Sequence, residues 1–230
     1  MGRDVGTTNL NLHKDTFPGI YRAKVEDNND PSQLGRIKVR IYPMLADVEA
    51  VLLPWAVPMY PIWEGAGTGI GFFAIPDVGT YVFVMFEQGD IYQPVYIGEA
   101  PTGTKGLPTE RTTNYPNRKV WKTSSGLRFI VDDTAKQIIV QTAGGIVGTI
   151  DDIALTVKIE TAGGIVGTID DIASTVRLDH PTGTYILVDT TGKITAYAVA
   201  DTLVQSTTKV DVMAPIINLT GSSAVNINPV

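Results

Sequence analysis

A six-residue apolar run, YVFVMF at residues 81–86, is the strongest strand signal in the first half of the chain. Both side-chain parities of this run are apolar, which is typical of a strand buried on both faces. Turn residues follow at 88–90, and the apolar pattern resumes at 95–97, so the sequence predicts a hairpin. In a small barrel one face of this strand fills the interior, and the other face then needs a partner.

Three further strands are predicted upstream, at residues 19–25, 36–41 and 51–57, the last interrupted by Pro54. The second of them alternates strictly between aliphatic and basic residues. We interpret its basic row, Arg36, Lys38 and Arg40, as a solvated strand face. The alternative is a contact with nucleic acid or with an acidic partner surface, since OB-folds often bind single strands through basic and aromatic residues.

These strands also carry a resemblance. A Gly-rich turn precedes Phe72-Phe73, Pro76, Gly79, the apolar run, Gly89-Asp90, Pro94, a second apolar strand and Gly98, and upstream lie LGRIKVR at 34–40 and LPWA at 53–56. This order is similar to the OB-fold domain of contractile-machine spikes, namely the phage baseplate spike proteins (the baseplate assembly protein V family) and the VgrG proteins of type VI secretion. The resemblance implies an OB-fold barrel over residues 17–100.

A repeat dominates the second half of the chain. Residues 142–160 recur as 161–179 with four differences, and each copy offers two short strands, 146–150 and 155–159 in the first, around an Asp-Asp turn. Such near-identity at a fixed period indicates stacked equivalent units. From about residue 185, small or apolar pairs recur at steps of eight residues, which is typical of a β-helix. Because nineteen is not a multiple of eight, wider turns and protruding hairpins both stay open for the longer repeats.

Each inward pair of the eight-residue units is too small to form a core within one chain. The simplest closed solution is three identical chains wound together, each forming one side of a triangular prism, with successive strands paired between chains. The predicted fold is therefore all-β: an arm at 1–16, the OB-fold at 17–100, a Pro- and Thr-rich linker at 101–120, and a trimeric, interwound β-helix stalk at 121–230.

Composition narrows the functional classes. The formal net charge is -6, so the chain lacks the overall basic charge of a nucleic-acid-binding protein. It contains no cysteine, which excludes disulfides and thiolate metal sites. No window is apolar enough for a membrane-spanning helix, and the polar first residues do not read as a signal peptide.

No constellation of residues predicts catalysis, a cofactor or a metal. Two distant histidines, His13 and His180, cannot form a familiar zinc site, and the glycine run at 65–69 lacks the helix and lysine of a phosphate loop. Trp55 and Trp63 are interpreted as core or interface residues, with a sugar-binding platform as the alternative. The remaining candidates are three acidic pairs, which we interpret as turn-forming residues because adjacent side chains on a turn point apart: Asp132-Asp133, Asp151-Asp152 and Asp170-Asp171.

The resemblance implies a non-enzymatic, homotrimeric central spike of a contractile-tail baseplate. Its OB-fold end attaches to the tail hub, a separate PAAR-like tip protein caps the other end, and the needle transiently contacts the host outer membrane. Binding of nucleic acid is not expected. The implied location is the virion tail, after assembly in the host cytoplasm. The 20-residue linker is too short for the lysozyme domain that some phage relatives carry.

Three alternatives come from other classes. An OB-fold nucleic-acid-binding protein with a β-solenoid tail predicts salt-dependent retention on single-stranded DNA. A β-helix enzyme, either an acyltransferase or a polysaccharide lyase, is disfavoured by the eight-residue unit and by the lack of a charged groove. A carbohydrate-binding tail fibre is disfavoured by the OB domain and by the scarcity of aromatic residues after residue 120.

Overall fold

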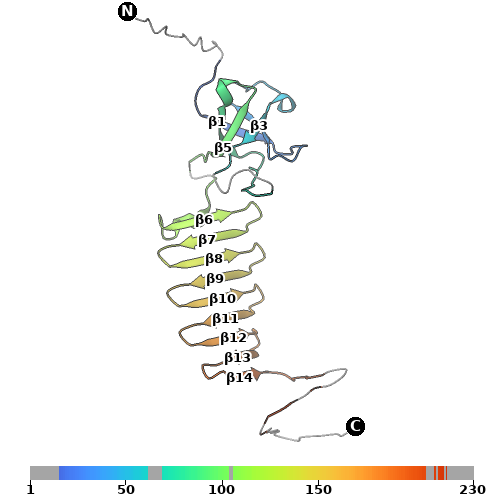
Figure 1. Ribbon diagram of the computed structural model, residues 1–230, viewed down its shortest axis with the longest axis vertical. Helices are drawn as coiled ribbons and strands as arrows, with labels where there is room; N and C mark the ends of the chain where they lie inside the picture. Colours follow the sequence, from blue (N-terminus) through green and yellow to red (C-terminus); the bar gives the residue numbers. More distant parts are fainter. Residues whose placement is uncertain are drawn as a thin grey trace, which may run out of the picture. The chain divides into compact units, whose positions relative to one another are not determined.

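The computed structural model describes residues 16–61, 69–103, 106–205, 210, 212–214 and 216. The chain divides into two compact units, Met1–Thr109 and Glu110–Val230. Within the described residues all regular structure is strand except for three short 3₁₀ helices, η1 (Ala50–Leu52), η2 (Glu87–Gly89) and η3 (Thr109–Thr112). The all-β prediction is confirmed (Figure 1).

The first unit is a closed five-stranded barrel with strand order β1-β2-β3-β5-β4. Its strands are β1 (Tyr21–Asp27), β2 (Ile37–Ile41), β3 (Trp55–Pro58), β4 (Tyr81–Phe86) and β5 (Pro94–Glu99). All neighbouring strands are antiparallel except β3 and β5, which pair in parallel. The predicted strand at 51–57 is shorter than expected, because its first residues form η1 and only those after Pro54 join the sheet.

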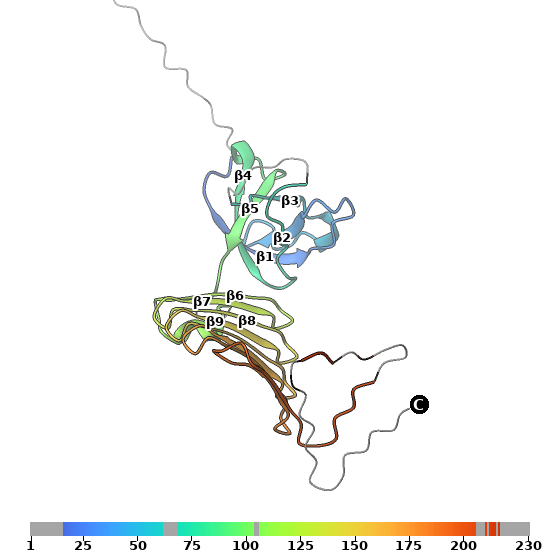
Figure 2. The ribbon, with the colours of Figure 1, turned by 60° about the horizontal axis from the view of Figure 1, so that its bottom comes forward.

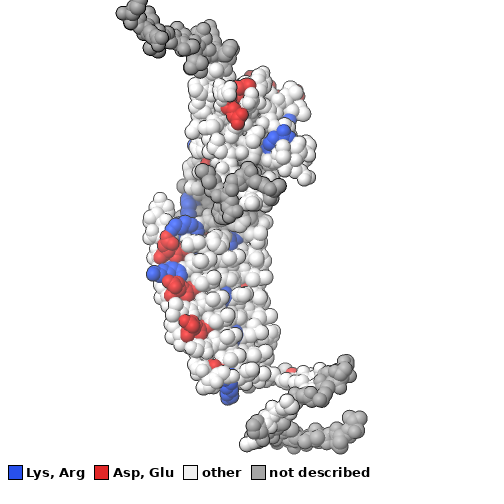
Figure 3. Space-filling model, in the orientation of Figure 1, with Lys and Arg blue, Asp and Glu red and all other residues white. Residues whose placement is uncertain are grey.

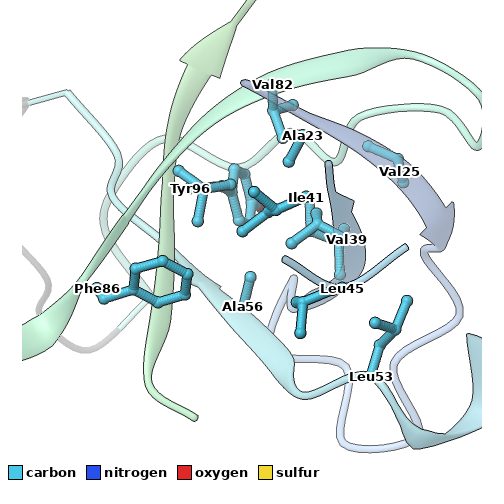
Figure 4. Close-up of a cluster of buried hydrophobic side chains, with 12 residues drawn as sticks. Ala23, Val25, Val39, Ile41, Leu45, Leu53, Ala56, Val82, Phe86 and Tyr96 are labelled. Carbon is cyan, nitrogen blue, oxygen red and sulfur yellow. The ribbon is translucent and has the colours of Figure 1, made fainter. Parts of the chain in front are cut away.

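The barrel core follows the alternation in the sequence (Figure 4). Val82, Val84 and Phe86 point inward from β4, and Ile37, Val39 and Ile41 point inward from β2. The outward parity of β4 is only partly covered. Arg22, for example, lies over the ring of Phe83 at 5.1 Å and donates hydrogen bonds to the carbonyls of Ala100 and Pro101.

The second unit is a nine-stranded antiparallel sheet in which strands that follow one another in sequence are also neighbours in the sheet. The strands are β6 (Arg118–Lys122), β7 (Arg128–Asp132), β8 (Gln137–Gln141), β9 (Val147–Asp151), β10 (Thr156–Glu160), β11 (Val166–Asp170), β12 (Thr175–Asp179), β13 (Tyr185–Val188) and β14 (Ile194–Tyr197). β6 begins inside the segment that the sequence assigns to the linker. Figure 2 shows the strands stacked into one curved sheet.

The interwound pairing predicted for the stalk is wrong for these strands. Short turns reverse the chain after each strand of β6–β13, so successive strands pair within one chain and not between chains. The strands predicted in the 19-residue repeats are present, as β9 to β12. From residue 198 on, the described residues form no strand, including those of the predicted pairs 202/204 and 210/212, and the predicted pairs 217/219 and 225/227 lie outside the described residues.

Candidate functional site: an uncovered apolar sheet face

The 19-residue period corresponds to two strands and two turns. One kind of turn begins with Thr123, Thr142 and Thr161, and its fourth copy begins with His180. In the second copy the Thr142 hydroxyl accepts a hydrogen bond from the Ile146 N–H at 3.1 Å, and the Thr142 N–H donates to the Ile146 carbonyl at 2.9 Å. Local side-chain bonds of this type favour turns over continued strand. The repeat therefore specifies a reversal of the chain at one edge of the sheet.

The other kind of turn uses the first residue of each Asp-Asp pair. Asp151 accepts hydrogen bonds from the N–H groups of Ile153 and Ala154, and Asp132 accepts them from Thr134 and Ala135. The backbone donors, foremost Ala135 and Ala154, lower the pKa of Asp132 and of Asp151 below the usual range of a carboxyl. The interpretation of these pairs as turn-forming residues is confirmed.

Glycine occupies the fourth position of each Thr-type turn for a steric reason. Gly145 has a φ of +88°, and a Cβ placed on it would lie 3.1 Å from the Cβ of Ala162 in the next turn of the stack. Gly126 and Gly164 face Ala143 and Pro181 in the same way, but a Cβ on them would lie at ordinary contact distances of 3.7 and 3.4 Å, and their φ values of +92° and +82° are the reason for glycine. The turns therefore stack on one another at the sheet edge, most closely at Gly145.

We expect Gly145→Ala to destabilise the sheet unit, while Gly144→Ala has little effect. The first substitution places a side chain in left-handed backbone and against Ala162, at a cost of roughly 1–3 kcal/mol. A Cβ on Gly144 would meet nothing within 4 Å, and its φ is not in the left-handed region. Urea unfolding of both full-length variants measures the difference. Equal midpoints would show that the turns do not stack in this way.

The main feature of the sheet unit is the separation of its two faces. Directly paired residues of antiparallel strands share a face. The apolar face consists of two rows, from β6 to β14: Trp121, Phe129, Val140, Gly148, Ile159, Gly167, Leu178, Ile186 and Ala196, and Lys119, Val131, Ile138, Ile150, Val157, Ile169, Val176, Val188 and Ile194. Lys119 is the one charged residue in these rows.

All charged side chains of β7–β14 lie on the opposite, polar face. They form local ion pairs there, such as Lys158 with Glu160 at 2.8 Å and Arg177 with Asp179 at 2.7 Å. Figure 3 shows charged residues of the sheet unit gathered along one side, with a broad uncharged surface beside them. The polar face therefore has the ion pairs that are expected of a solvated surface, whereas the apolar face of β7–β14 has no charged side chains.

The apolar face is exposed in the single chain. Twelve of its large apolar side chains are between 39% and 70% exposed; Ile138 is the least exposed of them and Ile194 the most. Side chains of this number and size present roughly 1,000 Å² of apolar surface, against ~300–600 Å² for the largest patch on a typical monomer. An area of that size also exceeds the ~800 Å² that one partner contributes to a standard protein interface. This face has the dimensions of an interface.

The apolar face contains a hollow of about 330 Å³ over β10 to β13. Val157, Ile159, Ile169, Val176, Leu178 and Ile186 are among the side chains around it, and Gly167 lies among them. Thr168 and Arg177 also border the hollow, although their side chains belong to the polar face. The hollow therefore offers space for aliphatic groups and almost no hydrogen-bonding chemistry.

The basic row of the barrel is not a solvated face, contrary to the prediction. Lys38 is only 8% exposed, and its ammonium donates a 2.5 Å hydrogen bond to the Val51 carbonyl and lies 5.0 Å from the Trp55 ring. Arg36 forms a two-pronged contact with the carboxylate of Asp30, which holds the pKa of that carboxyl well below its usual range. These cations are used inside the domain, which weakens the case for a nucleic-acid surface.

The other residues considered for chemistry are dispersed. His180 forms its turn through Thr182, whose hydroxyl lies 2.8 Å from the imidazole Nδ1. Tyr96, which sequence reasoning did not single out, donates a 2.6 Å hydrogen bond to the Gly35 carbonyl, and burial raises its pKa. His13, Trp63 and residues 65–68 of the glycine run lie outside the described residues. Across the part of the chain that the structure describes, no cluster of acidic and histidine side chains could hold a metal ion.

Comparison with known families identifies the barrel. A five-stranded barrel in this order defines an OB-like domain, and residues 21–100 match the family model of the type VI secretion system/phage-baseplate injector OB domain. The barrel of this chain is therefore similar to that family of domains. The match spans β1 to β5 and does not extend into the sheet unit. A comparison with curated proteins gives no match. None of the helices described here is long and apolar enough to cross a membrane.

Proposed function

We propose that this protein is the central spike of a contractile-tail baseplate, acting as a homotrimer that pierces the host cell envelope. The observation that carries the proposal is the apolar face, because a sheet with all its charges in β7–β14 on one side needs a partner for the other. Three copies related by a threefold axis would direct these faces inward and leave the paired charges in solvent. The injector family of the barrel supports a place in a baseplate.

The proposed mechanism is mechanical and involves no catalytic residue. The barrel domain attaches to the tail hub, and the stalk, closed around an apolar interior, transmits the force of sheath contraction to the outer membrane. A densely hydrogen-bonded antiparallel stack suits this task, since each strand from β7 to β13 is bonded on both sides. A separate PAAR-like protein at the far end would supply the tip. The proposed location is the tail of a virion that assembles in the host cytoplasm.

The experiment that tests the proposal is the solution mass of the full chain by light scattering. We expect a particle of three times the 24.7 kDa chain mass, which resists SDS until it is heated. Electron microscopy of the intact particle should then place it on the tail axis. A monomer at micromolar concentrations would overturn the assembly, and a dimer would replace the prism by two sheets packed face to face.

The rival function is an OB-fold nucleic-acid-binding protein with a β-sheet tail. It predicts retention on single-stranded DNA that weakens as salt is raised. We expect no retention at 150 mM salt, because Lys38, Arg36 and Arg40 are bound within the barrel. Salt-dependent binding by the purified chain would favour the rival.

A further inference from the structure

We propose that Gly148 and Gly167 form two sockets in the apolar face, each of which receives an aliphatic side chain from a facing copy of the same chain. The inference rests on the proposed homotrimer and adds the element that fixes the axial register between its copies. Gly148 pairs with Val140 on one side and Ile159 on the other, and Gly167 pairs with Ile159 and Leu178. Each glycine therefore lies in a depression between large side chains.

The rim of each socket continues along the strand. Side chains two residues apart in a strand share a face, so Ile150 lies beside Gly148 in β9, and Ile169 lies beside Gly167 in β11. Three large aliphatic residues of the same face thus adjoin each glycine, two on the paired strands and one on its own strand. The hollow of about 330 Å³ lies over the second of these positions, since Ile159, Gly167, Ile169 and Leu178 all line it.

Among the residues that the structure describes, nothing requires glycine at these two positions. Unlike the turn glycines, neither has a φ in the left-handed region. A Cβ at Gly148 would come no closer than 3.9 Å to the Val140 carbonyl, and one at Gly167 no closer than 3.9 Å to the Leu178 Cδ1. Both are ordinary contacts, and glycine inside a strand costs roughly 0.5–1 kcal/mol relative to alanine. A larger residue would therefore suit the isolated sheet better.

The proposed trimer gives a reason for glycine at these two positions. Closing apolar faces over unfilled sockets would leave cavities, which destabilise protein interiors. Rotation about a threefold axis parallel to the strand stack brings the same strand of each copy to one level, so the isoleucines beside each glycine are the groups available to fill it. The two sockets lie two strands apart, about 10 Å along the stack. If one copy were shifted along the axis by one strand, its Ile159 would stand at the level where the other copies require a glycine socket. The two sockets therefore select one axial register between the copies.

The test compares Gly167→Leu with Thr168→Leu in the full-length protein. Thr168 is the next residue of β11 and lies on the polar face, so the control adds the same side chain outside the interface. We expect Gly167→Leu to raise the concentration at which the trimer dissociates at least tenfold, with a smaller rise for Gly167→Ala. Thr168→Leu should leave it unchanged. Far-UV circular dichroism verifies that each variant retains its sheet.

A second-site change makes the test specific. Shortening Ile169 to alanine in the Gly167→Leu background should recover part of the lost association, because the facing copies then insert less volume. A wild-type trimer in which Gly167→Leu associates as tightly as before, or more tightly, would show that the socket is empty and would overturn this inference alone. A wild-type chain that remains monomeric would overturn the proposed homotrimer and this inference with it.

Discussion

Ile150→Asp should leave the full-length protein monomeric under conditions where the wild type is a trimer. Ile150 lies in the middle of the apolar face and is 50% exposed in the single chain, so the change is tolerable before assembly. In the closed prism each copy would bury an unpaired carboxylate, at roughly 3 kcal/mol or more per chain. Three copies together would lose on the order of 9 kcal/mol, more than a million-fold in the association constant.

The matched control is Thr149→Asp, one residue earlier in β9. Its side chain lies on the polar face, directly paired with Lys158, so the new carboxylate gains an opposite charge beside it. Light scattering over a concentration series, with circular dichroism to monitor the fold, gives the comparison. If both variants assemble like the wild type, the apolar face is not the interface, and the central argument for the spike fails. If both are monomeric, an added charge in β9 disrupts assembly from either face, and the argument that the apolar face alone is the interface fails.

The alternation of residue types was sufficient to predict which side chains share a face. The inward pairs Ile186/Val188 and Ile194/Ala196 lie together on the apolar face, as their spacing indicates. The pairing partner of each strand could not be predicted from the same pattern, because a period of two fits a strand bonded within the chain as well as one bonded between chains. The turns determine whether a strand pairs within its own chain or with another chain. The Asp-type turns contain Lys136, Leu155 and Ser174 in left-handed backbone, and their residue types do not signal this conformation.

The barrel shows a similar limit. The alternation at residues 36–41 correctly separates the inward aliphatic row from the basic row. It gives no information about the partners of the basic row, since these are mostly backbone carbonyls of the segment that follows β2. Those carbonyls become available only when Tyr42 to Leu53 folds back over the strand, a conformation that depends on contacts distant in sequence.

Arg40→Ala is expected to destabilise the barrel by about 3 kcal/mol. One terminal nitrogen of Arg40 donates to the carbonyls of Leu45, Ala46 and Val48 at 2.6–3.0 Å, and its Nε donates to the Glu26 carboxylate at 3.0 Å. The guanidinium is well shielded from solvent, and hydrogen bonds of charged groups contribute a net of about 1.5–3 kcal/mol each. A barrel of this size should then melt roughly 10–20 °C lower.

Two further variants separate this role from others. Arg40→Lys should recover little, because a single ammonium cannot reproduce the fork of donors that spans the loop and Glu26. Lys24→Ala removes a cation of the neighbouring strand whose contact with Glu26 is 3.6 Å long and whose side chain is 36% exposed, so it should change the melting temperature by less than about 3 °C. Differential scanning calorimetry of the full chain gives the comparison. An unchanged barrel transition in Arg40→Ala, together with weaker retention on single-stranded DNA, would reassign the basic row to nucleic-acid binding and favour the rival function.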